Sequence, residues 1–564
     1  MRKTILAILS VFICLLLTTL TTYGQDKIKV VVNGKQVIHT LRAPLNSTRT
    51  NGNCTRLPNR TIDGTCNNLT DPITFEYGAT DIPLRRLYTH AYADGINSMA
   101  GPNRPNPRSI SNTVVDQTGN ILSANSLSSM VFTWGQFLDH DISVTPAGSE
   151  SVPISLPANE PTFVSPMEFH RSLIHPGTGT TIPRAQTNLI TAWIDGSNVY
   201  GSEQTRADWL RTFRNGKLKT STGALLPYNT TTSEKNGPID PTAPSMAGED
   251  TNPKKFIAGD VRASEQPGLT SLHTLFVREH NRICDQLIAS GMSDDEALYQ
   301  RARKIVGALM QKITFEEFLP ALGLDLESYT GYDPAVNPNI FNEFSTAAYR
   351  IGHTMVTEHL PLADNNGHPT SSIPLMLAFF NPTIIASNGV EPILMGLMHQ
   401  TQQEVDPFVV SALRNFLFPI PGSAQAFGLD LVSLNIQRGR DHGLISYMSL
   451  RDLMSCEPIT GFDQISSDPI ISTKLAQAYD NDLEAIDLWV GLLAEDKLAG
   501  SSFSHTMSQL LYKQFSALRD GDFYYYENDP ALSTADRNSI KATTLEDVIL
   551  RNTTINNLST AFYN

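Results

Sequence analysis

The sequence is poor in cysteine and has no long apolar run beyond its first residues, and each shortage excludes a class of protein. Five cysteines in 564 residues are too few for a small domain that disulfides hold together. No stretch after the N-terminal segment reaches the roughly 18 uninterrupted apolar residues that a membrane-spanning helix needs. We therefore expect a protein that folds around its own hydrophobic core and carries no membrane span.

Positive charge is also scarce in this chain. It has 42 Lys and Arg residues against 56 Asp and Glu residues, which gives a formal net charge of −14. Such a negative field argues against nucleic acid and anionic membrane surfaces as partners, and it favours small neutral or redox-active substrates. With 40% hydrophobic and only 17% charged residues, the composition is that of a globular protein rather than a disordered one.

Residues 1–24 have the features of a secretory signal peptide. Arg2 and Lys3 precede an apolar run over residues 5–17, and small residues that suit cleavage follow at 21–24. The run is too short to read as a spanning helix. We expect the mature protein to be secreted, or periplasmic if the source is bacterial.

Four cysteines remain after the signal peptide. Cys54 and Cys66 flank a turn-rich segment at residues 59–64, so an oxidised pair would close a short loop, and we predict this disulfide. We expect Cys284 and Cys456 to be single thiols, with a pair as the alternative.

The hydrophobic pattern predicts a mainly α fold. Two β-branched runs around Asn33-Gly34 predict a hairpin over residues 28–38. Periodic apolar stretches predict helices over residues 202–213, 269–289, 294–319, 339–356, 406–417 and 443–454. Further helix is predicted between residues 474 and 518. Pro-, Thr- and Gly-rich pieces at 142–187 and 219–256 predict long surface loops. We expect a small N-terminal β-hairpin or arm at residues 25–70 and one large helical domain at 71–564, because no repeat or linker divides the chain.

The most chemically informative stretch is Trp-Gly-Gln-Phe-Leu-Asp-His-Asp at residues 134–141. We predict a helix that begins near Ser126 and runs through His140. Gln136 and His140 then share one face, and Asp139 and Asp141 flank it. This combination suits general acid/base chemistry or metal binding, and the alternative is a polar helix end with a solvated histidine.

A second stretch, at residues 191–200, alternates oxygen donors. The side chains of Thr191, Asp195 and Ser197 and the carbonyl of Trp193 are spaced so that a curved loop directs them at one cation. An all-oxygen set of this kind suits Ca²⁺ if a carboxylate from elsewhere completes it. The alternative is an ordinary Asp-Gly-Ser turn.

Two more stretches carry candidate site residues. Arg262 and Glu265 lie just before a predicted helix in Ala-Gly-Asp-Val-Arg-Ala-Ser-Glu-Gln-Pro-Gly-Leu. His353 follows Gly352, which would allow close approach of a flat ligand. Taken alone, a single histidine on an amphipathic helix is usually packed and hydrogen-bonded rather than a ligand.

Together these motifs resemble the animal haem peroxidase family. The stretches are WGQFLDHD, TAWIDGSNVYG, AGDVRASEQPGL, YRIGHT and, at residues 434–444, LNIQRGRDHGL. They occur in the order typical of the family, and the resemblance covers roughly residues 50–550. The resemblance implies a single helical haem-binding catalytic domain.

The resemblance implies a catalytic group on the distal side of the haem, where peroxide binds. His140 would be the distal base, Arg262 the distal cation, and Gln136 a hydrogen-bond partner or halide-site residue. On the opposite, proximal side, His353 would bind the haem iron, and Asn435 would hold its other ring nitrogen.

The resemblance also implies how haem b and calcium are held. Asp139 and Glu265 match the carboxylates that form ester links to the haem, and Arg438 is a candidate partner for a haem propionate. The calcium ligands would be Asp141, Thr191, the carbonyl of Trp193, Asp195 and Ser197.

The implied reaction uses hydrogen peroxide to generate a ferryl porphyrin-radical intermediate, which oxidises halides, thiocyanate or small aromatic donors. Gln266 follows Glu265, where family members with a sulfonium-linked haem have methionine. We therefore predict two ester links and no sulfonium, and oxidation of bromide, iodide or thiocyanate in preference to chloride.

Two alternatives belong to other functional classes. Fatty-acid oxygenases of the same superfamily have a radical tyrosine three residues before the proximal histidine, but this chain has Arg350 there. An exported matrix or adhesion protein could retain the fold without catalysis, but the residues of the distal, proximal and covalent-link motifs are all present.

Overall fold

The computed structural model describes residues 26–32, 35–41, 54, 57–70, 73–248, 253–418, 428–558 and 560–564. The predicted signal peptide lies outside these residues. Within them, no helix is both long enough and apolar enough to cross a membrane.

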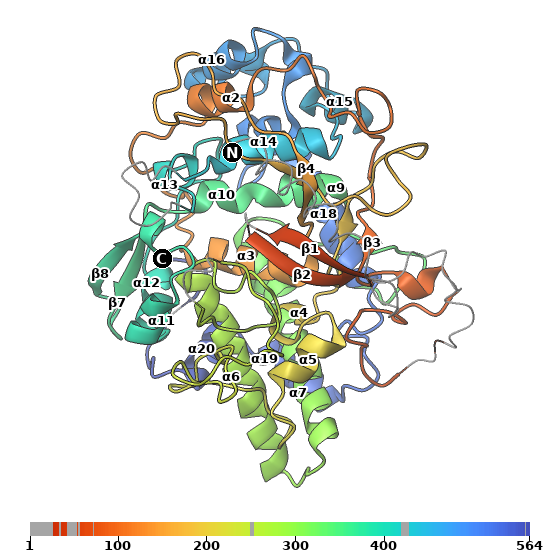
Figure 1. The fold of residues 1–564 in the computed structure, drawn as a ribbon, viewed down its shortest axis with the longest axis vertical. Helices are drawn as coiled ribbons and strands as arrows, with labels where there is room; N and C mark the ends of the chain where they lie inside the picture. The colour runs from red at the N-terminus through yellow and green to blue at the C-terminus, as the bar shows by residue number, and fades with distance from the viewer. Residues whose placement is uncertain are drawn as a thin grey trace, which may run out of the picture.

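The fold is mainly helical, as predicted. The α-helices of the described residues are α2 (Pro107–Val114), α3 (Met130–Ile142), α4 (Ser197–Tyr200), α5 (Gln204–Leu210), α6 (Pro267–Ala289), α7 (Asp295–Ile313), α8 (Leu319–Ala321), α9 (Asn342–Thr346), α10 (Gly352–Met355), α11 (Pro382–Asn388), α12 (Glu391–Met398), α13 (Ser411–Arg414), α14 (Leu431–Asp441), α15 (Tyr447–Leu453), α16 (Pro469–Ala478), α17 (Leu488–Ala494), α18 (His505–Asp520), α19 (Thr534–Ala542) and α20 (Leu545–Asn552). Short 3-10 and π turns are η1 (Thr74–Glu76), η2 (Thr314–Phe318), η3 (Ala348–Ile351), η4 (Leu375–Leu377), η5 (Phe462–Gln464) and η6 (Leu483–Ala485). In Figure 1 the long helices α6 and α7 form one end of the molecule, α14 and α2 lie toward the other, and α3 and α10 lie between them.

In the described part of the chain, eight short strands form three small antiparallel sheets. The strands are β1 (Asp26–Val32), β2 (Lys35–Leu41), β3 (Ile82–Pro83), β4 (Ala147–Ser151), β5 (His170–Ser172), β6 (Thr187–Asn188), β7 (His359–Ala363) and β8 (Pro369–Pro374). Their orders are β2-β1-β4-β5, β3-β6 and β7-β8. The predicted hairpin is confirmed, with Val32 paired to Lys35. The stretch predicted as a loop over residues 142–187 contributes β4 and β5. Because β4 reads Ala-Gly-Ser-Glu-Ser, which has low strand propensity, its pairing comes from its neighbours and not from its own sequence.

Several predicted helix boundaries are wrong. Helix α3 begins at Met130 rather than near Ser126, because the backbone of Ser126 has a positive φ of 55° that a right-handed helix does not allow. The stretch predicted as one helix over 339–356 is divided into α9, η3 and α10, since Ala347 leaves helical geometry at φ −130° and ψ −70°. Of the predicted helix at 406–417, only α13 forms.

Packing against the core determines which face of α3 points away from the core. Trp134 and Phe137 are fully buried, and their rings lie 5.8 and 5.3 Å from that of Phe276 on α6. Side chains three and four positions apart share a helix face. With the aromatic face turned toward α6, Gln136 and His140 are left on another side of the helix.

The cysteine predictions are confirmed. Cys54 and Cys66 form a disulfide with their Cα atoms 5.5 Å apart. Cys284 is a buried free thiol and Cys456 a half-buried one. The disulfide closes the loop that precedes the helical domain.

One carboxyl group away from the predicted site makes stability depend on pH. Burial raises the pKa of Asp406 to about 7 from 3.8, although its Oδ1 accepts a hydrogen bond from Phe408 N at 2.8 Å. Folding therefore favours the neutral carboxyl, so its stabilising effect is complete below the unfolded pKa and is lost as pH rises through about 7.

Replacing Asp406 by asparagine should remove this dependence, because the amide oxygen can still accept from Phe408 and carries no charge. We expect Asp406→Asn to raise the melting temperature more at pH 8 than at pH 5, measured by circular dichroism. An equal change at both pH values would contradict the assignment.

Candidate active site

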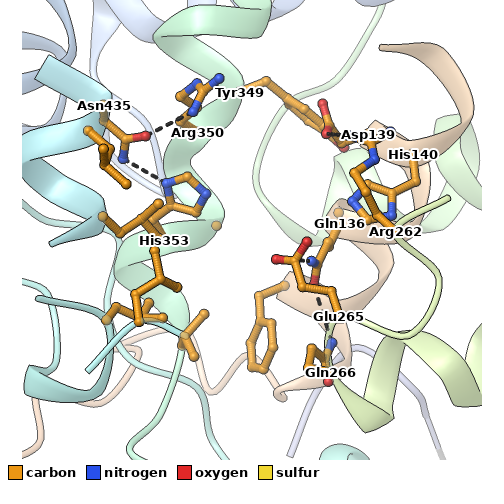
Figure 2. Close-up of a pocket in the computed structure, with 18 of the residues that line it drawn as sticks. Gln136, Asp139, His140, Arg262, Glu265, Gln266, Tyr349, Arg350, His353 and Asn435 are labelled. Carbon is orange, nitrogen blue, oxygen red and sulfur yellow. Dashed lines mark hydrogen bonds and ion pairs between the residues drawn. The ribbon is translucent and has the colours of Figure 1, made fainter. Parts of the chain in front are cut away.

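A cavity of about 600 Å³ lies between α3 and α10. Figure 2 shows Gln136, Asp139, His140, Arg262 and Glu265 on one wall, facing His353 and Asn435 on the other. The structure thus brings together residues that are far apart in the chain. All the residues predicted for catalysis and haem binding line this one cavity: Gln136, Asp139, His140, Arg262, Glu265, His353, Asn435 and Arg438.

The wall formed by α10 and α14 presents one histidine nitrogen to the cavity. Arg350 donates from Nη1 to Asn435 Oδ1 at 2.9 Å, and Asn435 Nδ2 lies 2.8 Å from His353 Nδ1. Since an arginine can only donate, the asparagine oxygen is its acceptor and the amide NH₂ group faces the imidazole. Burial, with a smaller effect of Arg350, lowers the pKa of His353 to about 3. The imidazole is therefore neutral, and because Nδ1 accepts from the amide, the ring proton lies on Nε2, where a bound metal would replace it.

The opposite wall holds a buried ion pair beside His140. Asp260 Oδ1 accepts from Arg262 Nε at 2.9 Å, and Asp260 Oδ2 accepts from Arg262 Nη2 at 2.9 Å. His140 Nδ1 lies 3.5 Å from Asp260 Oδ1. Burial and then the charge of Arg262 hold the pKa of His140 well below its usual value. His140 is therefore a neutral base at ordinary pH.

Asp260 was not predicted as a site residue. Although burial raises its pKa, the charge of Arg262 and the hydrogen bonds from Arg262 lower it more, so the group is ionised. The available sequence signal was the Asp-x-Arg spacing, which allows an aspartate to accept from the backbone two residues later, as Arg262 N donates to Asp260 Oδ1 at 2.7 Å.

A chain of amide hydrogen bonds orients Gln136. Gln266 Oε1 accepts from Gly268 N at 2.6 Å and caps α6. Gln266 Nε2 donates to Gln136 Oε1 at 3.2 Å, and Gln136 Nε2 donates to Glu265 Oε1 at 3.2 Å. Gln266, at the position where a sulfonium link would require methionine, thus fixes the amide of Gln136.

Two arginines besides Arg262 give the cavity positive charge. Burial lowers the pKa of Arg350 to about 10, and the group stays a cation at neutral pH. Arg438 donates from Nη1 to Ser172 Oγ at 2.8 Å and to Asp441 Oδ2 at 3.0 Å. The resemblance implied an anion partner for Arg438 but not for Arg350. The sequence marked Arg350 only as the residue that stands in place of the oxygenase tyrosine.

Tyr349 is a further cavity residue that the sequence did not mark. Its side chain is buried, its Oη has no hydrogen-bond partner among the described residues, and burial holds its pKa well above the usual value. Its ring stacks on Phe344 at 4.8 Å. It contributes a neutral hydroxyl at one end of the cavity.

Asp141 points away from the cavity and into the loop before α4. Its Oδ2 accepts from Asp195 N at 3.1 Å and Gly196 N at 3.2 Å, and its Oδ1 accepts from Asn198 N at 3.2 Å. Ser197 Oγ donates to the carbonyl of Asp141 at 2.7 Å. Helix α3 is therefore bonded to the loop that carries the predicted calcium ligands.

The carboxylates of this loop are poorly neutralised. Burial and the neighbouring Asp195 raise the pKa of Asp141 to about 8. Asp195 Oδ1 accepts from Thr191 Oγ1 at 3.3 Å, while the buried Oδ2 has no hydrogen-bond partner among the described residues. No cluster of three or more His, Cys, Asp and Glu side chains able to hold a metal occurs in the described part of the chain. A cation here would need the hydroxyls of Thr191 and Ser197 and a carbonyl as well as the two carboxylates.

Comparisons with known proteins agree on one family. A family model described as animal haem peroxidase matches residues 59–562. The Peroxidasin homolog of Mus musculus is 36% identical over 553 residues, which cover 87% of this chain and 36% of that protein. Peroxinectin A of Dictyostelium discoideum is 34% identical over 515 residues, covering 88% of this chain and 93% of that protein. The chain thus spans about a third of the length of the mammalian peroxidasin homologs that it matches.

Solved structures share the fold. Peroxidase A from Dictyostelium discoideum matches with a TM-score of 0.81 and 31% identity, and the match covers 90% of this chain and 100% of that one. A fatty acid alpha-dioxygenase of Oryza sativa matches with a TM-score of 0.72 over 88% of this chain and 84% of that one. Its 21% identity shows a shared fold and carries no functional conclusion.

Proposed function

The chain belongs to the animal haem peroxidase family, and on that premise we propose that it is an exported haem peroxidase. In this proposal it uses hydrogen peroxide to oxidise halides, thiocyanate or small aromatic donors. The observation that carries the proposal is the placement of neutral His140, beside Arg262, across one cavity from neutral His353. The signal-peptide features of residues 1–24 support export.

The residues of the cavity fit a haem. His353 is neutral, and its Nδ1 accepts from Asn435, so Nε2 would bind iron by giving up the ring proton. The cations of Arg350 and Arg438 suit the two propionates, and Asp139 and Glu265 would form the ester links. Bound haem supplies the iron and porphyrin that take up the oxidising equivalents of peroxide.

His140 and Arg262 would activate the peroxide. A neutral imidazole can accept a proton from one oxygen of hydrogen peroxide and return it to the other oxygen as the O–O bond breaks. Arg262 would stabilise the negative charge that develops on the departing oxygen. Its Nη1 is the nitrogen available, because Nε and Nη2 are held by Asp260.

Calcium would hold α3, the helix that carries His140, in place. In this proposal the ligands are Asp141, Thr191, the Trp193 carbonyl, Asp195 and Ser197. The fit rests on two adjacent buried carboxylates and on the partnerless Asp195 Oδ2, since a divalent cation would neutralise both charges.

The donor preference follows from Gln266 in this proposal. Its amide is bonded to Gly268 and Gln136, and a glutamine cannot form the sulfonium link of a methionine. The haem would then carry two ester links and be less electron-poor, which favours bromide, iodide and thiocyanate over chloride.

Steady-state assays of haem-loaded protein with hydrogen peroxide test this function. We expect turnover with iodide, bromide, thiocyanate and a phenol, weak turnover with chloride, and two ester links in mass spectra of haem-bound peptides. Efficient chloride oxidation near neutral pH would contradict the donor preference. Absence of a Soret band after expression with haem would contradict the peroxidase itself and favour a matrix or adhesion role.

The residues at the cavity argue against fatty-acid oxygenation. The position three before His353 is Arg350, whose guanidinium is bonded to Asn435 and to the carbonyl of Ser345. A tyrosyl radical cannot form at an arginine. Oxygen uptake with a polyunsaturated fatty acid and no added peroxide would contradict this conclusion.

A further inference from the structure

We propose that Asp260 is the positioning residue of the distal site, a single carboxylate that orients both Arg262 and His140 toward the cavity. The inference rests on the proposed peroxidase function and deepens it. In this proposal Asp260 determines which nitrogen of Arg262 and which nitrogen of His140 faces the peroxide.

The first line of evidence is how Arg262 is held. Both oxygens of Asp260 bind the edge of the guanidinium formed by Nε and Nη2, and Nη2 also donates to the carbonyl of Ser143 at 2.9 Å. A bidentate pair of this kind fixes the plane of a guanidinium as well as its position. The remaining nitrogen, Nη1, has only a 3.4 Å contact to Asp139 Oδ2. Arg262 is therefore held by one edge and offers the other to the cavity.

The second line of evidence is how His140 is placed. Its Nδ1 is buried, lies 3.5 Å from Asp260 Oδ1, and has no hydrogen-bond partner among the described residues. A carboxylate beside one ring nitrogen favours the tautomer with the proton on that nitrogen. Hydrogen bonds of this type are often long without substrate and shorten in the reacting complex. Asp260 thereby leaves His140 Nε2 unprotonated.

The position of Asp260 is itself set by α4. Asp260 N donates to the carbonyl of Asn198 at 3.0 Å. A Cβ atom at Gly259 would lie 2.4 Å from the carbonyl oxygen of Ser197, so only glycine allows this approach. The carboxylate is 1% exposed. The sequence Gly-Asp-Val-Arg thus packs one aspartate against α4 at a fixed distance from α3.

Few other charged groups compete for Asp260. Besides Arg262 and His140, the groups that influence it electrostatically are Asp139 on α3, His273 on α6 and Arg206 on α5. Burial lowers the pKa of His273 to about 4, so this group is neutral. The guanidinium of Arg206 is held by the carbonyls of Ala258 and Ser245. Arg262 is the one cation that Asp260 binds directly among the described residues.

The test compares two variants of haem-loaded protein with a matched control. Asp260→Asn keeps the shape without the charge, and Asp260→Ser keeps a side chain able to accept from Arg262 N. Glu279→Gln removes a buried carboxylate in the middle of α6, where it binds Arg282 and Arg551. Each protein is measured for melting temperature, haem content, rate constant with hydrogen peroxide and equilibrium affinity for cyanide.

We expect both Asp260 variants to react with peroxide about 10²-fold more slowly and to bind cyanide roughly tenfold more weakly, the scale of one charge-assisted hydrogen bond. With Arg262→Gln already present, Asp260→Asn should add much less than it does alone, because the two residues act as a unit. Glu279→Gln should lower only the melting temperature.

The inference is overturned if both Asp260 variants lose stability but keep peroxide rates and cyanide affinities like those of the unmodified protein. Failure of both variants to fold would also overturn it, because the carboxylate would then be a structural requirement. An unmodified protein that binds haem and does not react with peroxide would contradict the proposed function itself, which is a distinguishable result.

Discussion

Replacing His140 by alanine is expected to slow the reaction of the haem-loaded protein with hydrogen peroxide by roughly 10²- to 10⁴-fold, the usual contribution of a general acid/base group. His140 is a neutral, buried imidazole at the cavity, and its pKa lies well below the usual value because of burial and Arg262. Without it, no other described side chain in that position can accept the first proton. The rate constant is measured by stopped-flow absorbance at the Soret band as a function of peroxide concentration.

A second buried histidine provides the control. His280 lies on α6, donates from Nε2 to the carbonyl of Gly216 at 2.8 Å, accepts at Nδ1 from Tyr200 Oη at 2.9 Å, and does not line the cavity. His280→Gln should lower the melting temperature and leave the peroxide rate unchanged. If His140→Ala retained a rate near that of the unmodified protein, the assignment of His140 as the base would be wrong.

Local rules predicted the arrangement on α3 well. The helical period puts Gln136 and His140 on one face. In the structure Trp134 and Phe137 pack against Phe276 in the core, which leaves that face free. The wrong start of α3 did not disturb it, because the register within a helix is independent of where the helix begins.

The gathering of the cavity residues could not follow from local rules. His353 and Asn435 are 82 positions apart and are joined by one hydrogen bond. Such a contact depends on how α10 and α14 pack, and no periodicity encodes it. The resemblance of the motifs predicted that they would meet, and the structure places them around one cavity.

Asp260 and Arg350 show what pattern-based prediction misses. Asp260 precedes the predicted Arg262 by two residues, and its relation to His140 exists only because α4 holds it beside α3. The sequence showed only that position 350 is not a tyrosine. In the structure, the hydrogen bond from Arg350 to Asn435 orients the Asn435 amide toward His353. Each of these two residues acts by orienting a second side chain, and the sequence does not predict where that side chain lies.

Replacing Asp141 by alanine is expected to abolish calcium binding and peroxide reactivity together. The substitution removes one of the two buried carboxylates and leaves the backbone N–H groups of Asp195, Gly196 and Asn198 without their acceptor. Each unsatisfied buried group costs about 1–3 kcal/mol. Since Asp141 directly follows His140 in α3, loosening this loop should displace the imidazole, and a small misplacement can slow a reaction about 10²-fold. Bound calcium is measured by atomic emission, and reactivity by the stopped-flow rate.

A variant at another buried aspartate separates this coupling from general destabilisation. Asp487 binds Arg440 at 2.7 Å and lies at the start of α17, away from the calcium loop. Asp487→Ala should lower the melting temperature while calcium content is retained. Chelation of calcium from the unmodified protein should reproduce the slow peroxide reaction of Asp141→Ala, and added calcium should reverse it. Full peroxide reactivity in calcium-free protein would show that the cation does not position His140.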